Sequence, residues 1–180
     1  MARLVYLMGA SGVGKDTLLD EARRRHPEWL VAHRYVTRES GPSENSIGLT
    51  LDEFAVRQRT GLFCLSWQAH GLSYGLGVEL EAWLGRDGIV LVNGSRRALP
   101  DARRRFGDWL LPVLVTAPEA LLRQRLVSRG RETPDVIEAR LLRHRQLAAS
   151  LPEVAQIDNT GTPQTSLEGL SQLLEAGGSA

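Results

Sequence analysis

The sequence has almost no lysine, few aromatic residues and a single cysteine. Lys15 is the only lysine among the 22 basic residues, which 21 acidic residues bring to a formal net charge of +1. A chain so close to neutral has no general basic field, which argues against nucleic acid as a partner. The lone Cys64 has no second cysteine for an internal disulfide, and its apolar surroundings predict a buried structural thiol.

The sequence also lacks an apolar run long enough to cross a bilayer. The apolar stretch 3–8 passes directly into a glycine-rich segment, which predicts a buried strand rather than a signal or membrane segment. The 180 residues are 42% apolar and 24% charged, a composition that fits one compact domain with a full core. We therefore expect a single cytoplasmic domain over 1–180 with no membrane partner.

Apolar segments of strand length alternate with longer amphipathic segments along most of the chain. Strands are expected at 3–8, 88–94, 110–117 and 153–158, and helices at 16–26, 96–106, 118–130, 134–149 and 166–176. This alternation predicts an α/β fold with a parallel sheet flanked by helices. Between 34 and 77 the pattern changes to short segments with polar loops, which predicts an insertion over the sheet edge that forms a small acceptor lobe.

A phosphate-binding loop is predicted directly after the first strand. Gly9, Gly14 and Lys15 match the pattern G-x-x-x-x-G-K, with a strand before it and an amphipathic helix after it. In that setting the N–H groups of residues 11–15 and the helix dipole favour a polyphosphate such as that of ATP, and Lys15 reaches the β- and γ-phosphates. The alternative is a simple glycine turn. The predicted nucleotide contacts in the loop are Gly9, Ala10, Ser11, Gly12, Val13, Gly14, Lys15, Asp16 and Thr17.

Asp16 occupies the position at which such loops usually have a serine or threonine hydroxyl that binds Mg²⁺. A carboxylate is also a hard oxygen ligand, so Asp16 is a candidate metal ligand, directly or through water, with Thr17 beside it. Alternatively, Asp16 in the first helical turn only complements the helix dipole. The sequence leaves both interpretations open.

Further motifs extend along nearly the whole chain: "VAHRYVTR", "SENSIGLT", "LSWQAHGLSYGLG", "LVNGSR" and "RGRE", in addition to the loop "GASGVGKD". In these segments the chain resembles the guanylate kinase-like group of nucleoside monophosphate kinases. It is most similar to the branch of ribose 1,5-bisphosphate phosphokinases of phosphonate catabolism. The resemblance implies transfer of the γ-phosphoryl group of ATP to ribose 1,5-bisphosphate with Mg²⁺, giving 5-phosphoribosyl 1-diphosphate.

The acceptor segments depart from the guanylate kinase pattern in ways that change the chemistry. Ser66 stands where that family has the glutamate that reads guanine, Gly41 replaces a second phosphate-binding arginine, and Thr50 lies near an expected tyrosine. A serine cannot accept the paired hydrogen bonds that guanine offers to a carboxylate. Asn93 and Arg96 lie where that family has acidic residues. These departures imply a small bis-phosphorylated sugar as acceptor rather than a purine nucleotide.

The resemblance also implies an arginine-bearing lid over 125–140, in which Gly130 lets the turn close. Its candidate catalytic arginines are Arg125, Arg129, Arg131 and Arg140, for each of which a solvated surface role is the alternative. The attacking oxygen of the sugar phosphate is already anionic, so no general base is needed. Catalysis would then consist of alignment and of charge neutralisation by Lys15, Mg²⁺ and the lid arginines.

Side chains from several segments are candidates for holding the acceptor. Arg34 and Arg38 would share one face of a strand by period two, and Arg38 matches the family arginine in "RYVTR". Tyr74 is either a phosphate donor or a half-buried ring, and His70 either a phosphate contact or a structural hydrogen-bonder. The full predicted acceptor set is Arg34, Arg38, His70, Tyr74, Asn93 and Arg96. Asn159 in "QIDNTG" resembles a residue near the adenine, with a turn role as the alternative.

Three other functions compete with the sugar bisphosphate kinase. The nearest is a guanylate or other nucleoside monophosphate kinase. A non-catalytic interaction module would have a degraded loop, whereas this loop keeps both glycines and the lysine. A kinase for a sugar hydroxyl would need a base, for which Asp16 and Glu44 are the candidates. The sequence leaves the oligomeric state open, with a homodimer among the options.

Overall fold

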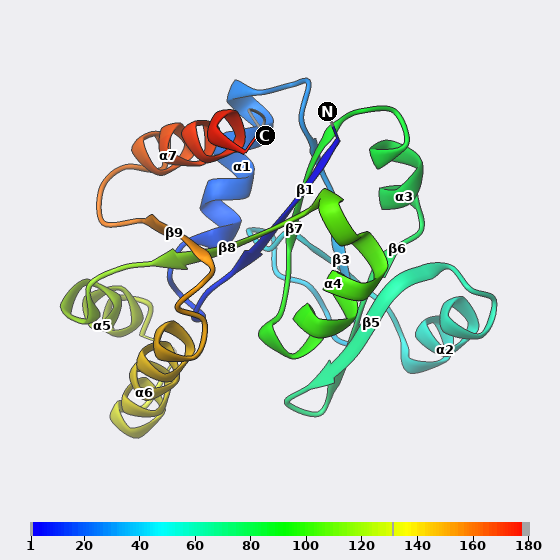
Figure 1. The fold of residues 1–180 in the computed structure, drawn as a ribbon. Helices are drawn as coiled ribbons and strands as arrows, with labels where there is room; N and C mark the ends of the chain where they lie inside the picture. Colours follow the sequence, from blue (N-terminus) through cyan, green and yellow to red (C-terminus); the bar gives the residue numbers. More distant parts are fainter. Residues whose placement is uncertain (1, 131, 178–180) are drawn as a thin grey trace.

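The computed structural model describes residues 2–130 and 132–177, and its centre is a parallel sheet with the order β2-β7-β1-β8-β9 (Figure 1). Its strands are β1 (Arg3–Met8), β2 (Leu30–Val31), β7 (Ile89–Asn93), β8 (Leu110–Thr116) and β9 (Ala155–Asp158). The central strand β1 pairs with β7 on one side and with β8 on the other. Because all these strands run in one direction, their carboxyl ends meet at one edge, where ligands bind in such sheets.

Side chains of β1 alternate between two hydrophobic clusters, one on each face of the sheet. Leu4, Tyr6 and Met8 join the cluster that includes residues of α3 (Glu79–Leu84) and α4 (Leu99–Phe106). Val5 and Leu7 join the cluster formed with α1 (Lys15–Arg25) and α7 (Pro163–Ala176). The expected α/β architecture, a parallel sheet with helices on both faces, is confirmed.

A second sheet, with the order β4-β3-β6-β5, is formed by the insertion. It contains β3 (Arg34–Val36), β4 (Ser46–Gly48), β5 (Phe63–Ala69) and β6 (Leu72–Gly77), and α2 (Leu51–Arg59) lies on its outer side (Figure 1). Leu65 and Leu76 of this sheet belong to the same cluster as Tyr6. The insertion therefore packs onto the hydrophobic cluster on one face of the main sheet.

Two further helices lie near the carboxyl edge of the main sheet (Figure 1). They are α5 (Glu119–Ser128) and α6 (Pro134–Ser150), which pack together through a small cluster of their own: Leu122, Leu126, Ile137 and Leu141. Short 3₁₀ turns, η1 (Arg96–Ala98) and η2 (Gly107–Trp109), flank α4. Among the described residues, none of the helices has both the length and the apolar character needed to span a bilayer.

Cys64 on β5 is partly buried, rather than fully buried as the sequence predicts. Its thiol donates to the carbonyl oxygens of Leu76 and Gly77, at 3.4 and 3.2 Å. Burial raises the pKa of this thiol to about 12, and the nearby Glu81 carboxylate acts in the same direction. At neutral pH the thiol is therefore protonated, as a structural cysteine should be.

Tyr6 ties the middle of β1 to the turn that follows β7. Its buried hydroxyl donates to the carbonyl oxygen of Ser95 at 2.9 Å and accepts from the N–H of Ser95 at 2.8 Å. The ring lies so close to Gly94 that a Cβ there would come within 2.3 Å of it. Tyr6 thereby fixes the position of the chain directly after Asn93, at the carboxyl edge of the sheet.

We expect Tyr6→Phe to lower the free energy of unfolding by about 1–3 kcal/mol, because the Ser95 N–H and carbonyl both lose a buried partner. Urea unfolding followed by circular dichroism measures the change. Tyr35→Phe is the matched control: Tyr35 uses its ring against Phe63 and Arg57, which phenylalanine retains, so the loss should stay within about 0.5 kcal/mol. Equal losses in the two variants would contradict this role of the Tyr6 hydroxyl.

Candidate active site

The predicted phosphate loop links β1 to α1 at the carboxyl edge of the sheet. Gly14 is the N-cap of α1, with φ of +103°, and no side chain caps the helix. A Cβ on Gly14 would lie 2.4 Å from Nδ2 of Asn159, so both the backbone conformation and the space require glycine here. The N–H groups of the first helical turn have no intrahelical acceptor and favour an anion at this position.

Two hydrogen bonds to the carbonyl oxygen of Val13 hold the loop in place. Nδ2 of Asn159 donates to this oxygen at 2.7 Å, and Nη1 of Arg125 donates to it at 3.2 Å. Oδ1 of the buried Asn159 accepts from the hydroxyl of Ser166 at 2.6 Å. Asn159 thus links the loop to α7 through the two ends of its amide, a role that the sequence did not indicate, and its contact with the adenine stays a prediction.

Lys15 folds back onto the loop. Its Nζ donates to the carbonyl oxygens of Gly9 at 2.6 Å and of Ala10 at 3.1 Å. Desolvation lowers the pKa of Lys15 to about 8; Asp16 opposes this shift and Arg34 adds to it. A polyphosphate beside the ammonium group would raise this pKa again, so the loop favours an anionic ligand at this amine.

The predicted lid lies against the loop through two of its arginines. Nη1 of Arg140 donates to the hydroxyl of Ser11, and its Nη2 forms an ion pair with Glu132 at 2.7 Å. Arg125 reaches the loop at Val13, as described above. Arg129 is exposed at the C-cap of α5, and Arg131 lies outside the described residues. Gly130, with φ of +62°, forms the turn after α5.

Arg34 on β3 carries a positive charge that acts on both Lys15 and Asp16. Its guanidinium lies over the ring of Tyr74, 4.8 Å from the centroid, and its Nε is buried without a hydrogen-bond partner. No carboxylate in the described part of the chain forms an ion pair with it. Burial lowers the pKa of Arg34, whereas Tyr74 and Asp16 act in the opposite direction. An unpaired, partly buried guanidinium is suited to an anion.

Arg38 follows the end of β3, so it does not share a strand face with Arg34 as predicted. It forms an ion pair with Glu44 at 2.8 Å and also donates to the carbonyl oxygen of Glu39 at 2.7 Å. Burial alone would raise the pKa of Glu44, but hydrogen bonding and charge from Arg38 outweigh it, so that pKa is lowered. A carboxylate with a lowered pKa is a poor candidate for the base of a hydroxyl kinase.

Two of the predicted acceptor residues lie in exposed positions. His70, with φ of +52°, forms with Gly71 the turn between β5 and β6. Positive φ at both residues is typical of a two-residue hairpin turn, so the place of His70 has a structural reason. Arg96 in η1 donates to the hydroxyl of Ser150 at the end of α6, at 3.1 Å. The described contacts bring neither residue to Arg34 or to the loop.

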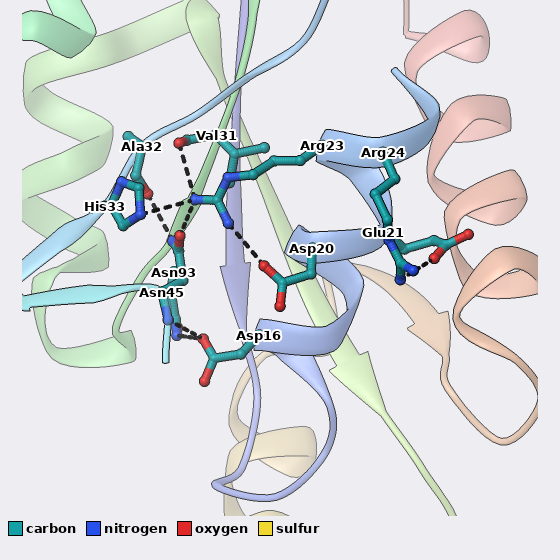
Figure 2. Close-up of polar contacts among 10 residues, drawn as sticks. All are labelled: Asp16, Asp20, Glu21, Arg23, Arg24, Val31, Ala32, His33, Asn45 and Asn93. Carbon is teal, nitrogen blue, oxygen red and sulfur yellow. Dashed lines mark hydrogen bonds and ion pairs between the residues drawn. The ribbon is translucent and has the colours of Figure 1, made fainter. Parts of the chain in front are cut away.

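Asp16 faces the end of β7 and the acceptor lobe (Figure 2). Its Oδ1 accepts from Nδ2 of Asn93 at 3.3 Å and from the N–H of Asn45 at 3.4 Å, and no such bond is formed to Oδ2 within 2–130 and 132–177. Oδ1 of Asn93 is buried without a partner. The sequence predicts Asp16 and Asn93 for this site but misses Asn45, because a single asparagine in a polar segment has no periodicity or motif to mark it.

A magnesium ion fits this arrangement. One oxygen of Asp16 is free to bind a cation, and the exposed Thr17 lies next to it in sequence. The described residues contain no group of three His, Cys, Asp or Glu side chains that could hold a metal by themselves. That is the usual situation for Mg²⁺, which is bound by one or two carboxylates together with substrate phosphates and water.

This loop, with the second sheet on one side and α5 and α6 on the other, defines a P-loop phosphotransferase with the guanylate kinase fold. A guanylate kinase from Anaplasma phagocytophilum aligns over 97% of this chain and 85% of its own, with a TM-score of 0.73 and 17% identity, which shows the fold alone. No protein-family model matches the sequence.

Curated relatives identify the family. The chain is 46% identical over 177 residues to a protein of Pectobacterium atrosepticum named ribose 1,5-bisphosphate phosphokinase PhnN, covering 97% of this chain and 94% of the relative. A protein of the same name from Yersinia pestis is 48% identical over 177 residues, covering 97% and 92%. The chain belongs to the ribose 1,5-bisphosphate phosphokinase family, and the predicted resemblance is confirmed.

We expect Asn159→Ala to lower the free energy of unfolding by about 1–3 kcal/mol and to weaken ADP binding, because Val13 loses one of its two donors and the Ser166 hydroxyl loses one of its acceptors. Urea unfolding and calorimetric titration with ADP measure the two effects. Gln146→Ala, an exposed amide on α6, serves as control and should change neither. Unchanged ADP affinity in Asn159→Ala would contradict its support of the loop.

Proposed function

We propose that this chain transfers the γ-phosphoryl group of ATP to ribose 1,5-bisphosphate in phosphonate catabolism, giving 5-phosphoribosyl 1-diphosphate. The observation that carries the proposal is Arg34, a guanidinium that lies over the Tyr74 ring with its buried Nε unpartnered, in a family whose members are named for this substrate. A single domain in the cytoplasm would carry out the reaction, with nucleotide and sugar phosphate as ligands and without nucleic acid or membrane as partner.

The donor nucleotide is held by the loop and by a lid over 125–140. The open N–H groups at the start of α1 suit the β-phosphate, and Lys15 exchanges its two loop carbonyls for phosphate oxygens. Arg125 and Arg140 already lie against the loop, so they are the lid arginines best placed to neutralise charge on the transferred group. Bound Mg²⁺ would be held by Asp16 and would neutralise charge on the phosphate oxygens.

The pocket beside Ser66 in the acceptor lobe over 34–77 is lined without a carboxylate. Ser66 lines a pocket of about 250 Å³ whose other lining residues are Phe54, Gln58, Trp67, Gln68 and Ser73. This lining contains no carboxylate, and guanine recognition needs one to accept from N1–H and N2–H₂. Arg34 and Arg38 supply positive charge on β3 and directly after it, which suits an acceptor that carries two phosphate groups.

The chemical step requires alignment and charge neutralisation rather than proton transfer. An oxygen of the 1-phosphate attacks the γ-phosphorus, a new P–O bond forms, and the bond to the ADP oxygen breaks. The attacking oxygen is already anionic, so no base has to remove a proton. Arg34 offsets the repulsion between the two polyanions, and closure of the lid over the loop keeps water away from the γ-phosphoryl group.

Assays of ADP release with ribose 1,5-bisphosphate and with GMP test the proposal directly. We expect turnover with the sugar bisphosphate and little with GMP. Lys15→Ala should lower kcat by at least about a hundredfold, because the positive charge that stabilises the transferred phosphoryl group is lost. Efficient turnover of GMP with none of the sugar would overturn the proposal in favour of a nucleoside monophosphate kinase. Unchanged activity of Lys15→Ala would instead support a binding module.

Replacing Asp16 tests whether its carboxylate is a metal ligand. We expect Asp16→Ser to raise the Mg²⁺ concentration needed for half-maximal activity, because a hydroxyl binds the cation less strongly than a carboxylate. A magnesium titration at saturating ATP gives the value, and circular dichroism checks that the fold is intact. The same magnesium dependence in both proteins would favour the alternative, in which Asp16 only complements the helix dipole.

A further inference from the structure

Asn45 connects the acceptor lobe to the Asp16 carboxylate (Figure 2). This residue lies directly before β4 and is only 4% exposed. Its N–H donates to Oδ1 of Asp16 at 3.4 Å, and its carbonyl oxygen accepts from the N–H of Arg34 at 3.2 Å. The backbone of the buried Asn45 therefore contacts both the carboxylate of Asp16, the proposed metal ligand, and the backbone of Arg34, a proposed acceptor contact.

The side chain of Asn45 is held at both polar ends. Its Nδ2 donates to the carbonyl oxygen of Ala32 at 2.8 Å, and its Oδ1 accepts from Nη2 of Arg23. Ala32 in turn donates its N–H to the carbonyl oxygen of Leu91 in the central sheet at 3.0 Å. A side chain with both ends engaged has one orientation, so the position of the Asn45 N–H is set by Arg23 and by the main sheet.

The guanidinium of Arg23 contacts several residues around Asn45 (Figure 2). Its Nη1 pairs with Asp20 at 2.9 Å, and its Nη2 also reaches the carbonyl oxygen of Val31 at 3.4 Å and Nε2 of His33 at 3.3 Å. Burial lowers the pKa of His33 and Arg23 adds to this shift, consistent with a neutral ring that accepts the bond. Arg23 lies two helical turns after Asp16 and touches no residue of the loop in these contacts.

We propose that Arg23 and Asn45 are positioning residues that orient the Asp16 carboxylate toward the magnesium ion of the nucleotide. Asn45 and Asn93 both donate to Oδ1, which leaves Oδ2 as the oxygen for the cation. Glu44, next to Asn45, pairs with Arg38, so the acceptor arginines and the metal-side carboxylate are linked through one short segment. This inference rests on the proposed function, because it takes Mg²⁺ with a nucleoside triphosphate as the ligand.

The test compares Arg23→Met with Arg24→Met. Arg24 is the next residue of α1, is exposed, and among the described residues pairs only with Glu21, at 2.6 Å, so the same substitution there removes an ion pair without touching Asn45 (Figure 2). The probe is the non-hydrolysable analogue adenylyl imidodiphosphate, whose binding is measured by calorimetry with and without Mg²⁺. Thermal unfolding of each variant checks the fold.

We expect Arg23→Met to raise the Mg²⁺ concentration for half-maximal binding of the analogue by at least about tenfold, as loss of a residue that orients a metal ligand does. Binding without metal should stay within about twofold, and Arg24→Met should match the unaltered protein in both measurements. Equal shifts in the two variants, or an unchanged magnesium dependence in Arg23→Met, would overturn the inference.

Asn45→Ala provides a second, smaller change if Arg23→Met does not fold. It removes the contact that Arg23 makes with this side chain, so a similar rise in the Mg²⁺ concentration for half-maximal binding of the analogue is expected. The double variant should lose no more than the larger single loss, because both substitutions break one chain of contacts. Fully additive losses of magnesium affinity would show that Arg23 acts independently of Asn45, and would overturn the proposal that Arg23 positions Asp16 through Asn45.

Turnover of the sugar bisphosphate and magnesium dependence together distinguish a failure of the positioning role from a failure of the proposed function. Intact turnover of the sugar bisphosphate with unchanged magnesium dependence in both Arg23→Met and Asn45→Ala overturns the positioning role and leaves the proposed function standing. Conversely, magnesium-dependent binding of the analogue that weakens in Arg23→Met, in a protein that does not turn over the sugar bisphosphate, supports the positioning role and overturns the proposed acceptor.

Discussion

The carbonyl oxygen of Val13 is the point on which the nucleotide site depends. It receives hydrogen bonds from Asn159, which follows the last strand of the sheet, and from Arg125 on α5. Glycine at position 14 lets the chain turn tightly over Asn159. Since the N–H groups that would hold phosphate follow directly from this turn, segments far apart in sequence must be assembled before the loop takes its shape.

Positive charge is placed around the loop at a cost in desolvation. Arg34 is partly buried without a carboxylate partner in the described chain, and Lys15 is held only by backbone carbonyls, so both side chains are stabilised less than they would be in water. Such sites favour an anionic ligand, because binding it removes an existing penalty. In the proposed reaction the acceptor lobe and the lid would approach the loop from opposite sides, as transfer between two anions requires.

The sequence predicts the parallel sheet and the loop well, because buried strands and a glycine-rich turn are local signals. Gly14 and Lys15 are found by spacing alone, and Asp16 by its difference from the usual residue. The sequence does not predict Asn45, nor that Asn159 supports the loop, because both roles depend on contacts between segments distant in the chain. The shared strand face of Arg34 and Arg38 depends on a strand long enough to include both, whereas β3 ends at Val36.

The near absence of lysine has a chemical consequence for this protein. Guanidinium groups as a class stay protonated at physiological pH, whereas desolvation lowers the pKa of the Lys15 amine to about 8. Acylating reagents that attack free amines therefore find a single side chain, at the centre of the phosphate loop. The rate at which Lys15 is acylated would therefore report whether a ligand occupies the loop.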